Sequence, residues 1–288
     1  MKTRTGAKIS AVLSDVDGTL VTDEKSLTAR TESAVAALRT AGIAFAIVSS
    51  RPPRGLRNLA TTLGIVTPMV CFNGGVIVEP DLSVLTTHLL AADVARRSVA
   101  ILEEKGVNVW VFAGQDWFLR RTGGSYVELE RHTVGFGPKL VEDFQPFFGS
   151  IAKIVGVSAD FDHLAQCERE VRTALASEAT VARSQPYYLD ITHPLANKGV
   201  ALASLAKLLG VPLTEIAVIG DGTNDVAMFE RAALSIAMGN AAPDVQQAAD
   251  LVTSRNGDDG FASAIERFIL AGTWPSVNIG STDVAGSA

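Results

Sequence analysis

The chain has 288 residues, of which 47% are hydrophobic and 19% charged, and its formal net charge is −6. A chain of this length is expected to form about two domains, and its apolar content is ample for a packed core. The negative net charge, with no block of like charge, argues against a nucleic-acid partner or an anionic membrane surface. A small anion remains compatible with this composition, because binding one needs only local positive charge.

Cysteine usage and the apolar pattern indicate where the protein works. Cys71 and Cys167 are far apart in sequence and lack metal-ligand spacing, so we interpret them as two reduced apolar residues. Residues 1–10 are polar and do not resemble a signal peptide, and no apolar run approaches the ~20 residues needed to cross a bilayer. We therefore expect a cytoplasmic protein without membrane association. Its oligomeric state is left open between a monomer and a small homo-oligomer.

The first predicted element is a short buried strand at residues 11–13, which runs into Asp15 and Asp17. Asp, Gly and Thr favour a turn there, so both carboxylates lie at the carboxyl end of a strand, where open α/β sheets hold ligands. Their repulsion is roughly 4 kcal/mol at about 4 Å and an effective dielectric of about 20. A hard cation such as Mg²⁺ would relieve it. For an isolated Asp-x-Asp, a solvated turn is the alternative.

A helix over residues 28–41 follows, with Thr28 as its N-cap and Gly42 at its end. The next buried strand, over 43–48, ends at Ser49, whose hydroxyl could bind an anion or close an ST-turn. This strand–helix–strand order predicts a parallel sheet. Asn73, after a short strand, could contact substrate or form a plain Asn-Gly-Gly turn. The other elements of this half are a helix over 54–63, a strand over 69–72 and a hairpin over 76–78 and 84–86.

From about residue 89 the pattern changes to an α+β unit with antiparallel pairing, inserted between two α/β halves. Residues 126–148 are predicted to be irregular, because glycines and prolines cluster there. The unit's other predicted elements are helices over 91–105 and 162–177 and strands over 107–112, 117–120, 151–157, 180–183 and 187–191.

The α/β pattern resumes at Asn197, which can cap a helix over 198–209. A buried strand over 216–219 then ends in GDGTND at 220–225. The last predicted elements are helices over 226–232, 245–248 and 260–270, strands over 235–238 and 251–252, and a tail.

Four stretches now share one property, because each ends a predicted core strand or begins a core helix. A parallel sheet places such positions along one edge, and the set comprises four carboxylates, one ammonium and one hydroxyl. Mg²⁺ fits among the carboxylates, and a phosphate fits among metal, lysine, hydroxyl and the helix N-terminus. The residues are Asp15, Asp17, Ser49, Lys198, Asp221 and Asp225.

In order and spacing, these stretches resemble the four motifs of the haloacid dehalogenase superfamily: DVDGTL at 15–20, Ser49-Ser50-Arg51 after a strand, Lys198-Gly199, and GDGTND at 220–225. With an insert after Asn73-Gly74-Gly75, the chain resembles the Cof-type subfamily. The resemblance implies an α/β protein with a Rossmann-like parallel-sheet core and an inserted α+β cap of class IIB. We expect the core at 1–85 and 193–272, a cap that sets substrate specificity at 86–192, and a flexible tail at 273–288.

The resemblance also implies an activity: Mg²⁺-dependent hydrolysis of small phosphate monoesters, often sugar phosphates, through an aspartyl-phosphate. Asp15 would be the nucleophile, already ionised at neutral pH, because an ordinary aspartate has a pKa of about 4. Asp17 would protonate the leaving oxygen and then take a proton from water. Mg²⁺ would bind the carboxylates of Asp15 and Asp221 and the backbone carbonyl of Asp17.

The remaining motif residues would support this chemistry. Ser49 and Lys198 would hold the phosphoryl oxygens, and Asn73 would contact substrate. Arg51 has a supporting role, while Asn224 and Asp225 would orient the waters of the metal and Lys198. The family commonly has Thr-Gly-Arg where this chain has Ser49-Ser50-Arg51, so Ser50 adds a side chain near the phosphate loop.

Two other functions fit the same motifs. A phosphomannomutase-like phosphomutase would return the phosphoryl group to a sugar, and a non-catalytic phosphometabolite sensor would bind without turnover. Asp17 favours phosphoryl transfer with acid–base help, because dehalogenases have no alcohol leaving group to protonate and lack this residue. The partner is expected to be a small phosphorylated metabolite. Cap residues that could reach it are Arg120, Arg121, His132, Tyr187, Tyr188 and His193.

Overall fold

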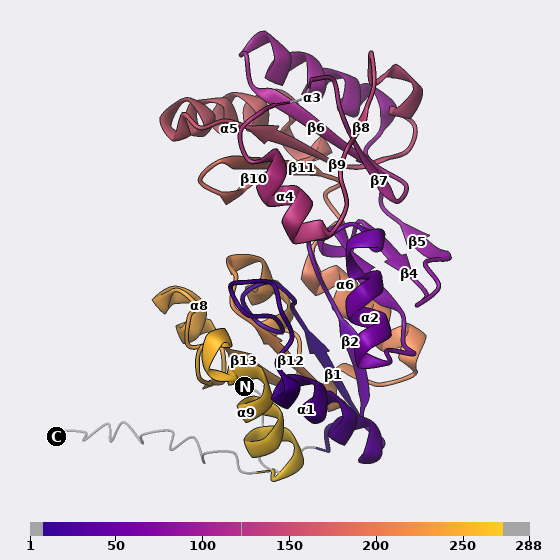
Figure 1. Ribbon diagram of the computed structural model, residues 1–288, viewed down its shortest axis with the longest axis vertical. Helices are drawn as coiled ribbons and strands as arrows, with labels where there is room; N and C mark the ends of the chain where they lie inside the picture. Colours follow the sequence, from indigo (N-terminus) through magenta and orange to yellow (C-terminus); the bar gives the residue numbers. More distant parts are fainter. Residues whose placement is uncertain (1–7, 122, 273–288) are drawn as a thin grey trace, which may run out of the picture.

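The computed structural model describes residues 8–121 and 123–272, arranged as two bodies joined by a narrow connection (Figure 1). The tail expected at 273–288 lies outside the described residues. The lower body is built on a five-stranded parallel sheet, and the upper body on a separate six-stranded sheet. In the described part of the chain, no helix combines the length and apolar character needed to span a lipid bilayer.

The core sheet has the strand order β14-β13-β12-β1-β2, and every neighbouring pair is parallel. Strand β1 lies inside the sheet, is buried on both faces, and pairs with the edge strand β2 on one side and the central strand β12 on the other. The carboxyl ends of three predicted strands therefore meet at one edge, as the motif positions require. The strands are β1 (Ala11–Ser14), β2 (Ala44–Ile47), β12 (Ile216–Gly220), β13 (Leu234–Ala237) and β14 (Leu251–Val252).

Helices cover both faces of the core sheet, because successive strand residues point to opposite sides. Val12 packs with α1, α2 and α9, whereas Leu13 packs with α6, α7 and α8. The predicted caps are confirmed: Thr28 accepts from the Thr31 N–H, and Asn197 accepts from the Val200 N–H. The helices are α1 (Ala29–Thr40), α2 (Arg57–Leu63), α6 (Lys198–Leu209), α7 (Val226–Phe229), α8 (Pro243–Ala248) and α9 (Gly260–Ala264), which continues as a π-helix over Ile265–Leu270.

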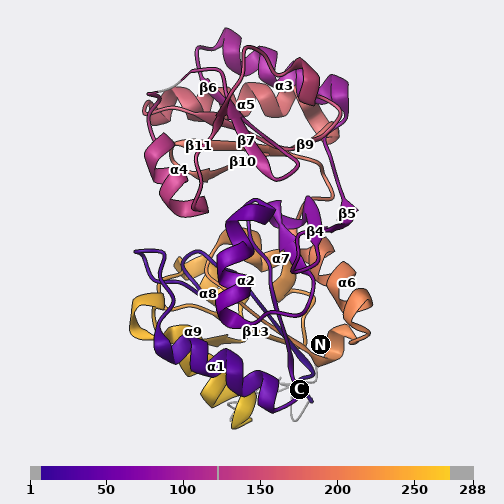
Figure 2. The same cartoon turned by 45° about the vertical axis from the view of Figure 1, so that its right-hand side comes forward.

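A small antiparallel sheet leads the chain from the core to the upper body, as the turned view in Figure 2 shows. It contains β3 (Met69–Cys71), β4 (Val76–Val78) and β5 (Val84–Thr87). A single bridge between Val48 and Val70 joins it to the end of β2. The predicted hairpin of β4 and β5 is confirmed, so the chain leaves the core beside the carboxyl edge of the core sheet.

The upper body, which we call the cap, has the strand order β10-β11-β9-β6-β7-β8. All pairs are antiparallel except β7 with β8. Helices α3 (Ala92–Glu104) and α5 (Phe161–Leu175) pack on one face. The strands are β6 (Asn108–Ala113), β7 (Asp116–Leu119), β8 (Lys139–Leu140), β9 (Ile151–Val157), β10 (Thr180–Gln185) and β11 (Tyr188–Thr192).

The prediction that residues 126–148 are irregular was wrong, because they contain β8 and the helix α4 (Val127–Val134). Helix α4 is short and buries only Val127 and Val134, so its sequence carries little helical periodicity. It ends at Gly135, which has the left-handed conformation typical of a helix end.

The cap docks on the core through α4 and the neighbouring strands. A Cβ on Gly55 would lie 3.3 Å from the Val134 carbonyl oxygen, so α4 rests closely on the turn after β2. Arg54 lies over the ring of Phe136 and forms an ion pair with Asp116 at 3.1 Å. The cap therefore sits over the carboxyl edge of the core sheet.

The Asn197 cap yields a first prediction. Asn197→Ala removes the acceptor for the Val200 N–H at the start of α6 and should lower the free energy of unfolding by about 1 kcal/mol. Denaturant titration measures the change. Asn197→Asp keeps an acceptor and should stay close to wild type. Equal midpoints for wild type and the alanine variant would show that the cap contributes nothing.

Candidate active site

The site begins where β1 ends. Asp15 continues the ladder with β12, because its N–H donates to the Ile219 carbonyl at 2.9 Å. Its side chain is almost fully buried. Burial raises the pKa of Asp15 well above the ordinary value; the Lys198 ammonium opposes this shift, and the carboxylates of Asp225 and Asp221 add to it. Asp15 is thus a carboxylate whose ionisation depends on nearby positive charge.

Lys198 supplies part of that charge from the first turn of α6. Its Nζ is fully buried and donates to Asp15 Oδ1 and, at 2.6 Å, to Asp225 Oδ1. The other oxygen of Asp225 accepts the N–H groups of Asp221 (3.0 Å) and Gly222 (2.9 Å). A Cβ on Gly220 would lie 2.3 Å from the Asp225 carboxyl carbon, so only glycine allows this approach. The network fixes both halves of the core around one ammonium.

Asp221 lies beside this network at the end of β12. Thr19 Oγ1 donates to its Oδ1 at 2.8 Å, and Asn240 Nδ2 lies 3.4 Å from its Oδ2. Burial raises the pKa of Asp221 to about 6, and the Asp225 charge acts in the same direction. A Cβ on Gly18, whose φ is +80°, would lie 2.3 Å from Asp221 Oδ2. The sequence therefore keeps the space in front of Asp221 clear.

The donor set fits a hard cation. Carboxylate oxygens of Asp15, Asp221 and Asp225 all lie within 4.8 Å of one another. Both oxygens of Asp225 are bound by protein donors, whereas Asp15 Oδ2 and Asp221 Oδ2 keep lone pairs for a ligand. Burial, with a smaller contribution from the neighbouring carboxylates, raises the pKa values of Asp15 and Asp221, and a divalent cation would favour their ionised forms. Asp15 and Asp221 are the side chains that could hold it, with Asp225 anchoring Lys198.

Asp17 is held by two cations. Arg51 donates to both of its oxygens, at 2.7 and 2.8 Å, and Lys25 Nζ lies 2.9 Å from Oδ1. Burial alone would raise the pKa of Asp17, but the hydrogen bonds and charge of Arg51, with the Lys25 charge, lower it to about 2. Asp17 is therefore ionised. In this form it can accept a proton as a general base, but it has no proton to donate as a general acid.

Ser49, Asn73 and Asn224 come together beside this ion pair. The buried Ser49 Oγ accepts from the Arg51 N–H at 3.1 Å, which closes the ST-turn and leaves its hydroxyl proton free to donate. The Ser49 carbonyl accepts from the Asn73 N–H, and Asn73 Oδ1 accepts from Asn224 Nδ2 at 3.0 Å. Ser50 is not among the described residues with positive φ, so this backbone does not require the family's glycine.

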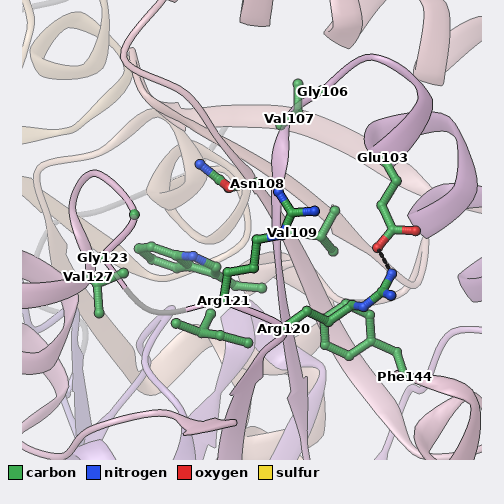
Figure 3. Close-up of a pocket in the computed structure, with 13 residues that line it drawn as sticks. Glu103, Gly106, Val107, Asn108, Val109, Arg120, Arg121, Gly123, Val127 and Phe144 are labelled. Carbon is green, nitrogen blue, oxygen red and sulfur yellow. Dashed lines mark hydrogen bonds and ion pairs between the residues drawn. The ribbon is translucent and has the colours of Figure 1, made fainter. Parts of the chain in front are cut away.

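The structure thus brings all nine residues predicted for the site to one edge of the core sheet. The cap residues that the sequence offered as substrate contacts lie in different parts of the cap. Arg120 binds Glu103 and the Glu142 carbonyl, and with Arg121 it lines a pocket of about 510 Å³ (Figure 3). None of the nine predicted residues lines that pocket. Tyr188 instead lies on the cap sheet among other aromatic rings.

Three residues of the site were missed in the sequence. Thr19 lies inside the first motif but has no charge to draw attention. Asn240 follows β13, the next strand of the sheet, so the rule that strand ends carry functional groups could have found it; its Nδ2 also donates to the Gly18 carbonyl at 2.9 Å. Lys25 lies in a loop outside any motif, and its left-handed backbone, with φ of 62°, gives no signal in the sequence.

Comparisons with known proteins agree in family and fold. A family model described as haloacid dehalogenase-like hydrolase matches residues 12–265. A putative phosphatase of Haemophilus influenzae is 27% identical over 257 residues, covering 89% of this chain and 97% of that protein. A 5-amino-6-(5-phospho-D-ribitylamino)uracil phosphatase of Bacillus subtilis is 25% identical, with 93% of this chain and 98% of that protein covered.

Solved structures share the whole architecture. A haloacid dehalogenase-like hydrolase from Bacteroides thetaiotaomicron superposes with a TM-score of 0.83 at 28% identity, covering 91% of this chain and 100% of that one. A sugar phosphatase of HAD subclass IIB superposes with a TM-score of 0.79 at 23% identity, covering 90% and 98%. The predicted fold, a parallel-sheet core with an inserted class IIB cap, is confirmed.

The clamp on Asp17 predicts a pH dependence of stability. Its folded pKa lies below the ordinary 3.8, so its contribution of about 2 kcal/mol is complete above pH 3.8 and is lost as the pH falls through about 2. The stability of wild type relative to Asp17→Asn should therefore shrink as the pH falls, to about half near pH 3. Denaturant titrations between pH 7 and 2.5 measure it. The exposed Asp244→Asn is the charge-matched control, and a difference that stays constant with pH would contradict the clamp.

Proposed function

Because the chain belongs to the haloacid dehalogenase-like hydrolases and is a phosphatase of that family, which hydrolyses phosphate monoesters, we propose that it acts on small phosphorylated metabolites with Mg²⁺ as cofactor. The observation that carries the proposal is the buried group of Asp15, Lys198 and Asp225 beside Asp221. It combines a carboxylate nucleophile with a cation that stabilises negative charge at the same point.

Asp15 is the proposed nucleophile. One oxygen of its carboxylate attacks phosphorus; a new P–O bond forms as the bond to the leaving oxygen breaks. The product is an aspartyl-phosphate, which water hydrolyses in the second step. Bound by the Asp15 and Asp221 carboxylates and the Asp17 carbonyl, Mg²⁺ would supply positive charge for the phosphoryl oxygens. Lys198 and the Ser49 hydroxyl donate to those oxygens, and Asn73 and Asn224 border the substrate.

Asp17 is the proposed acid and base, and its ion pairs suggest how one residue does both. An incoming phosphate monoester carries negative charge that competes for Arg51 and Lys25, which weakens their hold on Asp17 and raises its pKa. Asp17 can then carry the proton that the leaving oxygen needs. Once the leaving group departs, the two cations return to Asp17 and favour the ionised form, which takes a proton from the attacking water.

Phosphate release from a panel of sugar phosphates, nucleotides and p-nitrophenyl phosphate tests this function. We expect release that requires Mg²⁺, stops with EDTA, and falls by at least about 1,000-fold in Asp15→Asn, because the amide is not a nucleophile. Asp244→Asn, an exposed charge-matched control, should retain activity. Thermal unfolding of each variant shows that it is folded.

Three results would change the assignment. Release that survives in Asp15→Asn would mean that another group attacks phosphorus. Phosphate transfer that appears only with a sugar bisphosphate would identify a phosphomutase. No release from any ester by the folded, Mg²⁺-supplemented protein would leave a phosphometabolite sensor.

A further inference from the structure

The face of the cap sheet that looks toward the core carries charged side chains. Leu189 and Ile191 of β11 pack with α3 and α5 on the far face, so Tyr188 and Asp190, which alternate with them, point to the core side. Lys153 of β9 lies on the same face, with its Nζ 3.5 Å from Asp190 Oδ2. Two charged residues thus occupy a sheet surface that is rich in aromatic and aliphatic side chains, such as Trp110, Phe112 and Val155.

These polar groups are buried but incompletely satisfied. Lys153 and Asp190 are each only 8% exposed. Asp190 Oδ1 has no hydrogen-bond partner in the described part of the chain. Lys153 Nζ touches Asp190 at the limit of a hydrogen bond and lies 5.2 Å from the Phe112 ring centre. A buried polar atom without a partner is costly, so a ligand that supplies partners here would bind favourably.

Contacts across the docked surfaces place this cluster opposite the catalytic edge. The Phe112 ring, under Lys153, meets Phe72 edge-on at 5.8 Å, and Phe72 immediately precedes Asn73. From α4, Glu130 completes the cluster, because the ring of Tyr126, which begins this helix, packs edge-on against Tyr188 at 6.2 Å. Burial raises the pKa of Glu130; the Lys153 charge opposes this, while the charges of Asp190 and the catalytic Asp17 add to it. Glu130 therefore lies within electrostatic reach of both the cap pair and Asp17.

The charges of the cluster define which groups it can accept. Two carboxylates, Asp190 and Glu130, face one ammonium, Lys153, so the cluster has an excess of acceptors and of negative charge. A hydroxyl or amino group can donate to the free Asp190 oxygen. A second phosphate or a carboxylate on the substrate would meet like charge in a buried place, where the penalty is large.

From this arrangement we propose that Asp190, Glu130 and Lys153 determine specificity by binding the leaving group of the substrate. They select phosphate esters whose remainder is uncharged or cationic and rich in hydrogen-bond donors, and they reject esters with a second anionic group. The proposal rests on the proposed phosphatase function, because it concerns the part of the substrate that leaves Asp15.

Two open-chain esters test this selection, because they differ only at the end of the carbon chain away from the phosphate. Glucitol 6-phosphate has a hydroxymethyl group where 6-phosphogluconate has a carboxylate. We expect wild type to prefer glucitol 6-phosphate by about tenfold or more in kcat/KM. For an ester that turns over slowly, its inhibition constant against p-nitrophenyl phosphate gives the same ratio.

Variants show whether the cluster causes the preference. Asp190→Asn and, separately, Glu130→Gln should each reduce the ratio at least threefold, mainly by improving KM for 6-phosphogluconate, because each removes one negative charge. Asp162→Asn makes the same charge change in α5, on the opposite face of the cap sheet, and should keep the wild-type ratio. Two variants at different elements keep the test valid where one of them folds poorly.

The outcomes separate this proposal from the function on which it rests. If p-nitrophenyl phosphate is hydrolysed but the wild-type ratio is near one, or neither sugar ester binds, the selection is overturned. It is also overturned if both folded cluster variants keep the wild-type ratio. Absence of Asp15-dependent hydrolysis of every ester, p-nitrophenyl phosphate included, would instead overturn the phosphatase function itself.

Discussion

One buried ammonium holds the carboxyl edge of the core sheet together. Lys198 is completely inaccessible and binds Asp15, which is 183 residues away, and Asp225, on the following loop. Burying such a charge costs free energy of desolvation unless well-placed opposite charges offset it, and the two carboxylates provide that offset. Asp15 belongs to the first half of the core, and Lys198 and Asp225 belong to the second. The two halves, separated in sequence by the whole cap, must therefore come together before Lys198 has both of its ion-pair partners.

Glycines allow the carboxylates to approach one another this closely. The backbone at Gly18 turns with φ of +80°, and any side chain there or at Gly220 would overlap an acidic group. The backbone N–H groups of Asp221 and Gly222 then reach Asp225 directly. The spacing of the GDGTND stretch is thus a consequence of packing around Asp225, and the space left free lies between Asp15 and Asp221.

Much of the core, and the place where the candidate site residues gather, could be predicted because both follow from short sequence patterns. Apolar runs ending in Asp or Ser mark strand ends, and parallel pairing collects them. The clamp on Asp17 could not be predicted in this way: Arg51 belongs to a motif, but Lys25 reaches Asp17 only through the path of an irregular loop. The same holds for Glu130, whose helix α4 has too few buried residues to show a period. Asp190 lies in a predicted strand, but the sequence does not show that its side chain is on the face of the cap sheet that looks toward the core.

One short segment contacts both the cap and the proposed phosphate site. Phe72 and Asn73 both have positive φ, at 51° and 58°, which is unusual for two consecutive residues with side chains and strained for a bulky one. The Phe72 ring packs on Phe112 of the cap, while the Asn73 N–H binds the Ser49 carbonyl and its side chain binds Asn224. A movement of the cap that releases the Phe72 ring would remove a contact that holds this strained pair. The contact with the cap and the hydrogen bonds of Asn73 to Ser49 and Asn224 therefore meet at this one pair of residues.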